Sequence, residues 1–232
     1  MSKTLIHQPE YLPWINLFIK MNLAEKFVIL DNVQYSRRSF QNRNLLPNIK
    51  KNCKDYITIP IQKAAFTCKI NKIKIDYTQN WIDKHLEKIK INYSKSKFFE
   101  EVFELILKQL NHKEKYLSNL NENFLKLISL KSNIKCEFIK ASELNVMGSK
   151  SDLILNICKK IGTNTYITGL GSKNYLDEKS FDQNNIDVKF IKPIVKNFKF
   201  KNQSINPNYS IIDFLFNFGF KNLNEFLDKN VT

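Results

Sequence analysis

The sequence predicts an α/β fold, in which a Rossmann-like, largely parallel sheet is flanked by helices and the middle segment is mainly helical. Strand-like and helix-like segments alternate at both ends of the chain, and residues 80–131 carry predominantly helical patterns. The clearest strand-like run is apolar almost throughout, which is typical of strands buried on both faces of a parallel sheet. The chain has 232 residues, of which 43% are hydrophobic, so we expect one domain over residues 1–232.

The first three predicted elements form a βαβ unit. Residues 3–7 (KTLIH) are a short β-prone run, and residues 14–24 (WINLFIKMNLA) have the character of an apolar helix. Residues 26–31 (KFVILD) are a near-continuous apolar run that is closed by Asp31. Strand, helix and strand in this order are the expected start of a Rossmann-like sheet.

The segment that follows is polar. Residues 32–54 show no helical or strand period, and a loop of this length in a compact domain is usually functional or disordered. After it, residues 55–61 (DYITIPI) and 69–75 (KINKIKI) alternate as strands do, with Pro60 at a strand end.

The middle of the chain predicts helices. Residues 80–93 (NWIDKHLEKIKINY) have a helical pattern with Asn80 as its cap, and residues 97–131 give one or two further amphipathic helices.

The α/β alternation then resumes. Residues 134–142 (IKCEFIKAS) predict a strand, and the helix after it starts with a capping box of Ser149 and Asp152 and ends with Gly162 just beyond its last turn. Residues 165–169 (TYITG) predict the next strand.

The last part of the chain predicts a turn, a strand and a helix. Residues 168–177 (TGLGSKNYLD) indicate a glycine-containing turn before a helix, and residues 187–191 (DVKFI) a strand. Residues 206–220 predict a closing helix in which Ser210 and Asp213 again form a capping box.

The charge of the chain suits a small anionic ligand. The formal net charge is +15, but the lysines are scattered and do not form a stripe with interleaved aromatic residues, so we expect no DNA-binding role. Of the 37 Lys and Arg residues only three are arginines, and all three lie in residues 34–43, QYSRRSFQNR. A guanidinium is a planar fork that contacts phosphate or carboxylate in a bidentate way, which a lysine cannot reproduce.

Several other classes are not supported by the sequence. The four cysteines have no CxxC spacing and the three histidines are far apart, which argues against a zinc site. We find no apolar run of membrane-spanning length and no hydrophobic region of a signal peptide in MSKTLIHQPEYLPW. We therefore expect no membrane insertion, a cytoplasmic location and reduced thiols.

Three polar segments are candidates for a site. The first is HQPEYLPW, residues 7–14, which follows a predicted parallel strand; ligands bind at the carboxyl ends of such strands, so His7 and Gln8 are well placed to face a substrate. The alternative, that His7 caps a helix or lies in the core and that the prolines only punctuate the chain, stays open at this point.

The second segment, residues 31–44, carries the arginines among amide side chains. This mixture suits phosphate oxygens and the edges of a sugar or base, and an aromatic ring there could stack on a ligand. The alternative is a solvated surface loop. The residues concerned are Asp31, Gln34, Tyr35, Arg37, Arg38, Phe40, Gln41, Asn42 and Arg43.

The third segment is TGLGSKNYLD. Its glycines, Gly169 and Gly171, let the backbone approach a ligand, and Lys173, Tyr175 and Asp177 could flank it, although the full dinucleotide fingerprint is absent and the segment could be only a tight turn. Because each of the three segments follows a predicted parallel strand, we expect them to converge on one cleft.

In their order along the chain, these segments resemble the WbqC-like family. The matching blocks are HQPEYLPW, FVILDNVQYSRRSFQNR, DYITIPI, the helix with Trp81, YITGLGSKNYLD and the terminal YSIIDFLFNFG. The resemblance directs attention to His7, Gln8, Pro9, Tyr11, Pro13, Trp14, Asp31, Gln34, Asn42, Arg43, Gly169, Gly171, Tyr175 and Asp213.

This resemblance implies a glycine transferase that acts on amino-sugars in the synthesis of bacterial surface polysaccharides such as O-antigen lipopolysaccharide. On this hypothesis a small acyl or aminoacyl group is transferred to the amine of a nucleotide-activated amino-sugar. Arg37, Arg38 and Arg43 hold the diphosphate, His7 is the base and Asp31 orients the sugar or the His. Gln8, Tyr11, Trp14, Gln34, Asn42 and the residues of the third segment complete the substrate site.

The sequence leaves the donor and the oligomeric state open. No cofactor is assigned. The donor is expected to be an activated acyl or aminoacyl compound, and tRNA is expected only as a carrier of the aminoacyl group. A requirement for ATP stays open. Two other functions compete with the transferase. One is a nucleotidylyl-transferase-like adenylating enzyme, for which a second His is missing, and the other is a carbohydrate-binding pathway protein without catalysis.

Overall fold

The structure is a computed structural model, which describes residues 2–48, 52–64 and 67–229. Five parallel strands form the main sheet: β1 (Lys3–His7), β2 (Lys26–Ile29), β5 (Glu137–Lys140), β6 (Thr165–Gly169) and β7 (Asp187–Ile191). Two antiparallel hairpins lie outside it, formed by β3 (Arg43–Asn48) with β4 (Cys53–Thr58), and β8 (Phe198–Phe200) with β9 (Gln203–Ile205).

The helices are α1 (Ile15–Asn22), α2 (Trp81–Tyr93), α3 (Phe99–Asn111), α4 (Leu117–Lys131), α5 (Lys150–Lys160), α6 (Glu178–Gln183) and α7 (Ile211–Lys229). Short 3₁₀ turns are η1 (Ile70–Lys72), η2 (Ala141–Glu143) and η3 (Leu170–Asn174). The predicted α/β class, its parallel sheet and its helical middle segment are confirmed.

The strand order, β5-β2-β1-β6-β7, contains one reversal of direction. The chain first steps outward from β1 to β2 and β5, and then crosses back to place β6 on the other side of β1. In sheets of this kind, ligands bind in the crevice outside the carboxyl ends of the two strands at the reversal. Here those ends are His7 of β1 and Gly169 of β6.

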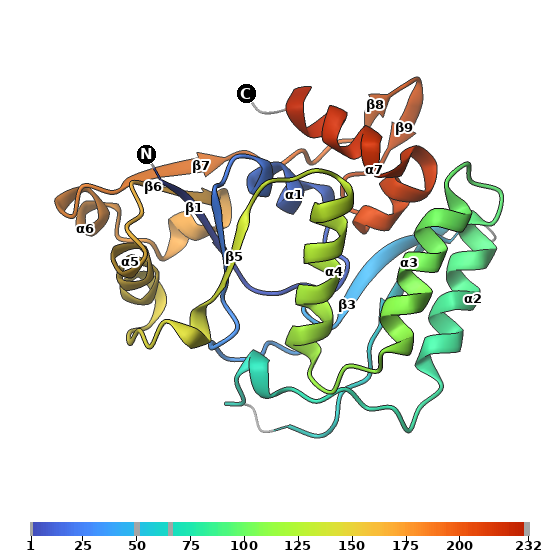
Figure 1. Cartoon of the computed structure of the whole chain (residues 1–232), viewed down its shortest axis with the longest axis horizontal. Helices are drawn as coiled ribbons and strands as arrows, with labels where there is room; N and C mark the ends of the chain where they lie inside the picture. Colours follow the sequence, from blue (N-terminus) through green and yellow to red (C-terminus); the bar gives the residue numbers. More distant parts are fainter. Residues whose placement is uncertain (1, 49–51, 65–66, 230–232) are drawn as a thin grey trace.

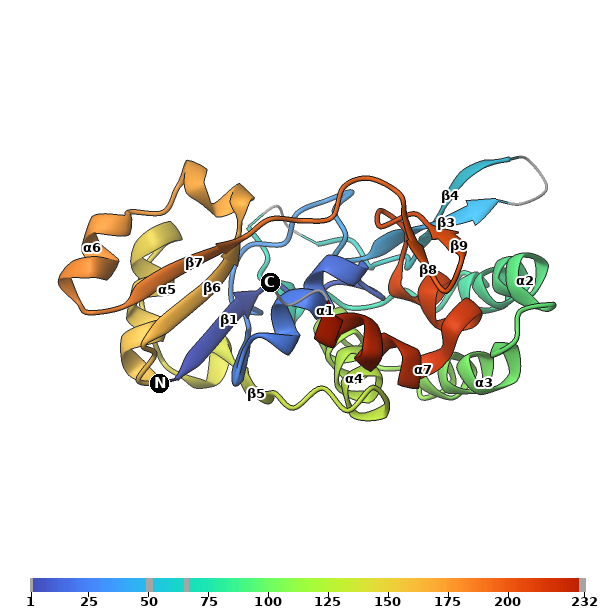
Figure 2. The same cartoon turned by 90° about the horizontal axis from the view of Figure 1, so that it is seen from above.

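Both faces of the sheet are buried, because alternate strand residues enter two different cores. Leu5 and Phe27 belong to the larger core with α1 and α7, whereas Ile6 and Val28 belong to the smaller core with α5 and α6. Figure 2 shows α5 and α6 on one side of the sheet and α1 and α7 on the other. This two-sided burial explains why the strand segments are apolar without polar alternation.

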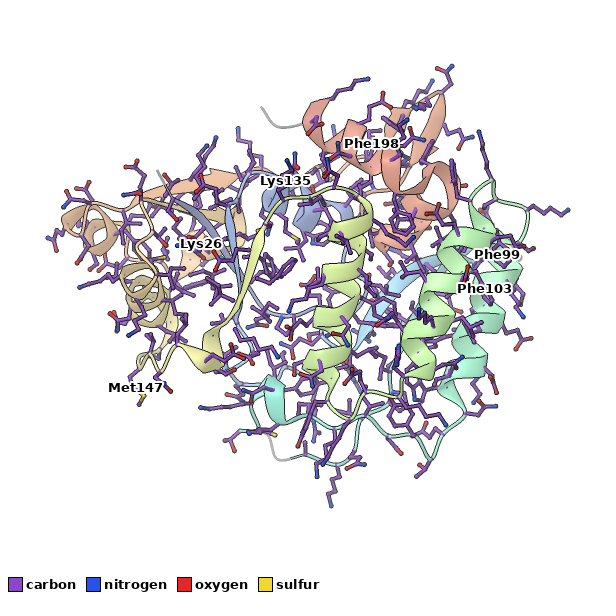
Figure 3. The ribbon with its side chains drawn as sticks, viewed as in Figure 1. Lys26, Phe99, Phe103, Lys135, Met147 and Phe198 are labelled. Atoms are coloured by element: carbon purple, nitrogen blue, oxygen red, sulfur yellow. The ribbon has the colours of Figure 1, made fainter. Side chains whose placement is uncertain are left out.

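The middle helices extend the larger core away from the sheet. Figure 1 shows α2 and α3 side by side, with α4 between them and the sheet. Phe99 and Phe103 of α3 stack on each other with ring centroids 4.9 Å apart, at the side of the molecule farthest from the sheet (Figure 3). Phe198 of the small hairpin stacks on Phe226 of α7, which fastens β8 to the closing helix (Figure 3).

Two element predictions were wrong. Part of the predicted loop at residues 32–54 is strand β3 with the start of β4, although residues 49–51 lie outside the described part. The predicted strand at residues 69–75 is the turn η1 with isolated bridges, because Ile70 and Asn71 donate their N–H groups to the carbonyls of Val33 and Asp31. At both places hydrogen bonds to other segments determine the backbone conformation. Local sequence periodicity does not reveal such bonds.

The helix ends lie at the predicted residues, but the predicted capping hydrogen bonds do not all form. Ser149 is the N-cap of α5 but makes no side-chain capping bond, and Gly162 follows the helix with φ of +68°, as expected of a residue beyond the last turn. At α7, Ser210 Oγ accepts a hydrogen bond from Ile212 N at 3.4 Å. Asp213 does not complete a capping box, because its carboxylate accepts a hydrogen bond from the Tyr93 hydroxyl.

Gly219 gives a test of the packing at α7. Its φ of +77° and ψ of 172° interrupt the helix, and a Cβ added there would lie 2.7 Å from Cδ1 of Phe98. We predict that Gly219→Ala lowers the free energy of unfolding by about 2–4 kcal/mol, from backbone strain and overpacking together.

Urea denaturation measures this change. Gly171→Ala is the matched control, since its added Cβ meets no atom within 4 Å in the described structure, and a change below about 0.5 kcal/mol is expected. Equal effects of the two substitutions would contradict the packing at Gly219.

Candidate active site

A cleft of about 410 Å³ lies at the reversal of the sheet. We call it the switch-point cleft. It combines the end of β1 and the segment after it, one face of α1, the β6–η3 turn and the residues after β7. The described lining residues are Ile6, His7, Gln8, Glu10, Trp14, Asn16, Lys20, Leu30, Ile154, Tyr166, Thr168, Gly169, Leu170, Gly171, Ser172, Tyr175, Ile191, Lys192 and Pro193.

His7 is a half-buried imidazole whose orientation is fixed by the backbone. Its Nδ1 lies 2.9 Å from the carbonyl oxygen of Gln8. A carbonyl only accepts hydrogen bonds, so Nδ1 carries the proton and the lone pair of neutral His7 is at Nε2. Burial, followed by the nearby Lys20 cation, lowers the pKa of His7 to about 3. His7 is therefore a neutral imidazole at physiological pH.

Lys20 is a buried lysine in the wall of the cleft. It comes from α1, is only 8% exposed, and forms no ion pair in the described part of the chain. A Cβ added at Gly169 would be 3.7 Å from its Nζ, so the amine lies beside the end of β6. Burial lowers its pKa, and the Glu10 carboxylate opposes that change.

Glu10 is the single acid among the described residues that line the switch-point cleft. Its Oε2 is shielded from solvent and has no hydrogen-bond partner in the described structure. Burial raises the pKa of Glu10 to about 7, although the Lys20 cation acts in the opposite direction. The cleft thus contains an imidazole, a carboxyl group and an amine with pKa values displaced by the same burial, which is a pattern that is enriched at functional sites.

The glycine turn after β6 forms another part of the wall. Ser172 Oγ donates to the carbonyl of Gly169 at 2.8 Å and accepts from Thr168 Oγ1 at 3.0 Å, which holds the turn after β6 in place. Gly171 and Tyr175 also line the cleft, as expected from the sequence. Lys173 and Asp177 are not among the described lining residues: Lys173 Nζ lies 4.8 Å from the ring centroid of Phe190, and Asp177 accepts a hydrogen bond from Ser180.

The arginine segment lines a different cavity, of about 530 Å³. We call it the arginine cavity. Its described walls contain three cations and no acid; they are Gln34, Tyr35, Ser36, Arg37, Arg38, Asn42, Ile61, Gln62, Lys63 and Ala64. The prediction of one common cleft is therefore right for the first and third segments and wrong for the arginines.

A hydrogen bond joins the two cavities. Gln41 Nε2 donates to Gln8 Oε1 at 2.7 Å, and Gln41 Oε1 accepts from the N–H of Ser36 at 3.0 Å. Gln8 lines the switch-point cleft and Ser36 lines the arginine cavity, so one buried amide lies between them.

Three further residues that the sequence marked as site candidates, Tyr11, Arg43 and Asp31, also lie outside the described walls of both cavities. Tyr11 is fully buried, with its hydroxyl 3.2 Å from Nδ1 of His85. Arg43, in β3, holds its guanidinium 4.2 Å from the ring centroid of Tyr56 and is not among the described residues of either cavity.

Asp31 is a buried structural acceptor. Its carboxylate accepts hydrogen bonds from the N–H of Ser142 at 2.9 Å and from the hydroxyl of Ser142 at 2.7 Å. It is absent from the described walls of both cavities, and the partner of His7 Nδ1 is the carbonyl of Gln8 and not Asp31. It instead attaches the end of β2 to the turn after β5.

Sequence reasoning missed Glu10, Lys20 and Lys192. The signal for Lys20 was present: the segment INLFIKMN is apolar on all sides except for Asn and Lys, and a lysine there must be buried or reach a cavity. Glu10 lies inside the HQPEYLPW segment, and nothing in its local sequence distinguishes it from a solvated acid.

The described part of the chain contains no group of three or more His, Cys, Asp or Glu side chains placed to hold a metal ion. No described helix has both the length and the hydrophobicity needed to cross a membrane.

The raised pKa of Glu10 predicts a pH-dependent stability difference. Native Glu10 holds its proton up to about pH 7, whereas the unfolded side chain loses it near 4.5, so its ionisation lowers the free energy of unfolding as pH rises through that window. We predict that Glu10→Gln is stabilised relative to wild type by about 2 kcal/mol more at pH 8 than at pH 5. Urea denaturation at both pH values tests this.

Glu178→Gln removes the same charge from an exposed position on α6 and serves as the control. Its difference from wild type should be the same at both pH values. A Glu10 variant that behaves like this control would show that the carboxyl is solvated.

Comparison with known proteins agrees with the resemblance seen in the sequence. A Mycobacterium tuberculosis (strain ATCC 25618 / H37Rv) protein named "Uncharacterized protein Rv1507c" is 29% identical over 222 residues, covering 94% of this chain and 95% of the relative. No solved structure matches the chain. The profile of the WbqC-like protein family matches residues 8–225, so the chain belongs to the WbqC-like protein family.

Proposed function

We propose that the protein transfers a small acyl or aminoacyl group, in the narrowest form a glycyl group, to the amine of a nucleotide-linked amino-sugar. The reaction would serve the synthesis of bacterial surface polysaccharides and take place in the cytoplasm. The observation that supports it most is His7, a neutral imidazole in the switch-point cleft with its lone pair at Nε2. Amine acylation needs such a proton acceptor beside the attacking nitrogen.

The proposed step is nucleophilic attack of the amine on the acyl carbon of an activated ester or thioester. The C–N bond forms, the bond from the acyl carbon to the leaving group breaks, and the leaving group departs with its electron pair. His7 Nε2 accepts the proton that the nitrogen loses as the amide forms. The Lys20 cation, in the same cleft, would stabilise the negative charge on the acyl oxygen.

The arginine cavity is proposed to hold the diphosphate of the sugar nucleotide. Arg37, Arg38 and Lys63 give it a positive charge without any acid in its described wall. Guanidinium groups contact phosphate oxygens in pairs, and charge-assisted contacts of this kind are stronger than neutral hydrogen bonds. The neighbouring switch-point cleft would then receive the sugar.

Mass spectrometry of the acceptor tests this function. Uridine diphosphate glucosamine is incubated with the protein and, in separate arms, glycyl-tRNA, a glycyl thioester, or glycine with ATP. A glycyl adduct on the sugar in any arm supports the proposal, and pyrophosphate release confined to the ATP arm would indicate the adenylating alternative. Binding of the sugar nucleotide without any product in all arms would favour a non-catalytic carbohydrate-binding protein.

The role of His7 predicts a loss of turnover without a loss of binding. His7→Gln should lower kcat by about 10²- to 10⁴-fold, the usual range for a removed proton acceptor, and leave the affinity for the sugar nucleotide nearly unchanged. Because the pKa of His7 lies near 3, wild-type turnover should show no inflection from His7 between pH 5 and 8. His112→Gln, at an exposed position, is the matched control, and equal rates for both variants would make His7 structural.

The arginine cavity predicts a specific affinity change. Arg38→Gln should weaken binding of uridine diphosphate by about 10-fold, since one charge-assisted contact is worth about 1.5–3 kcal/mol. Lys160→Gln removes the same charge from an exposed position at the end of α5 and should change little. Isothermal titration calorimetry measures both affinities. Equal affinities of the two variants for uridine diphosphate would contradict binding of the diphosphate in this cavity.

A further inference from the structure

We propose that Glu10 binds the ammonium group of the acceptor and takes its first proton, so that Glu10 and His7 act as two successive proton acceptors. This inference rests on the proposed function. It assigns the recognition of the amine, and therefore the choice of an amino-sugar over an ordinary sugar, to one carboxylate in the switch-point cleft.

The stoichiometry of amide formation requires two proton losses. An amine next to electronegative groups has a pKa of about 8, like an α-amino group, so near neutral pH much of the acceptor is an ammonium ion. The ammonium must lose one proton to free the lone pair that attacks. The nitrogen must lose a second proton once it is bonded to the acyl carbon. The overall change is ammonium plus activated acyl compound to amide plus leaving-group anion plus two protons.

His7 has the capacity for only one of these protons. Its Nδ1 already carries a hydrogen that is donated to the carbonyl of Gln8, so Nε2 is its single basic position. A base with a pKa near 3 is also poorly matched to an ammonium ion, because proton transfer between them is strongly uphill. It is better matched to the more acidic nitrogen of the tetrahedral intermediate. A second acceptor is therefore needed for the first proton.

Glu10 has the position and the chemistry of that acceptor. It lies in the same wall segment as His7, and no other acid is among the described residues of the cleft. Its Oε2 is buried without a hydrogen-bond partner in the described structure, which is costly for a carboxylate that no cation touches. An ammonium ligand would supply the missing donors. A pKa of about 7 for this carboxyl is then close to that of the ligand, so the proton can pass between them with little cost.

The charged groups near Glu10 do not hold its carboxylate in an ion pair in the described structure. Lys20 from α1 and Lys192 after β7 are the lysines of the cleft, and His7 and Tyr175 are its other described titratable residues apart from the buried Tyr166. Lys20 influences the pKa of Glu10 but makes no ion pair within 4.0 Å in the described structure. Glu10 and Lys20 therefore line the same cleft without being joined in an ion pair in the described structure.

A pair of probes that differ in one group tests the proposal. Uridine diphosphate glucosamine and uridine diphosphate glucose differ at the sugar only by an amine in place of a hydroxyl. Isothermal titration calorimetry at pH 7.5 should give wild type about 10-fold or greater preference for the amine, the value of one charge-assisted hydrogen bond. Glu10→Gln should abolish this preference, whereas Glu178→Gln and His7→Gln should keep it.

The pH dependence of the preference gives a second readout. Below about pH 7 Glu10 is protonated, and above about pH 8 the ligand is no longer an ammonium, so the preference should peak between these values. The ratio of the two affinities removes the contribution of the nucleotide, which both probes share. The acid limb of this ratio should be absent in Glu10→Gln, which keeps Lys20 and Lys192, so its loss assigns the limb to Glu10.

The outcomes separate this inference from the function on which it rests. An unchanged preference in Glu10→Gln, or equal affinities of wild type for both probes, overturns the role of Glu10 and leaves amine acylation standing. A preference that depends on Glu10 but is followed by no transfer from any donor supports amine recognition and removes the transferase. Failure of wild type to bind either probe contradicts both.

Discussion

The site depends on the burial of an irregular backbone segment. Residues 8–13 leave the central strand β1 without forming a helix or strand, yet Tyr11 and Leu12 are fully buried. Buried carbonyl and N–H groups must find partners, and an irregular segment finds none within itself. Other parts of the chain supply them. This requirement connects β1 to the arginine segment, to β3, to α4 and to α7.

Buried polar side chains provide most of these partners. Asn44 Nδ2 donates to the carbonyls of Tyr11 and Leu12, and Ser210 Oγ also donates to that of Leu12. Asn121 Nδ2 joins the carbonyls of Pro9 and Gln41, which links the segment to α4 and the arginine segment at once. Leu12 has a φ of +43°, a strained value for a residue with a bulky side chain, and the two hydrogen bonds to its carbonyl help to hold it there. The position of Glu10 and the approach of Gln8 to Gln41 follow from these bonds.

The same bonds explain which parts of the structure were predictable. The strands of the sheet were predicted because Ile6, Val28 and Ile167 are buried by the layer architecture, which leaves a local apolar signature. The hairpin that begins with β3 was missed because its residues include polar ones such as Asn44. The local sequence does not distinguish an asparagine that donates to a distant carbonyl, as Asn44 does to that of Tyr11, from one in a solvated loop. His7 and Gly169 were predicted to face a cleft because ligands bind at strand ends, and both line the switch-point cleft. Lys20 was missed because it lies on a helix face whose surroundings only the fold reveals.

The division into two cavities follows from the arginine segment's attachment to β1. Tyr11 N donates to the carbonyl of Phe40, and Gln41 joins Gln8, so the segment turns back beside β1 before it can cover the switch-point cleft. Arg37 and Arg38 are thereby kept in a different cavity from His7 and Glu10. This separation has a chemical consequence: arginines beside Glu10 would favour its ionised form and lower its pKa, and it would no longer be matched to an amine. In the described structure burial dominates over charge at Glu10, and the cation that acts on its pKa belongs to Lys20, whose own pKa is lowered by burial.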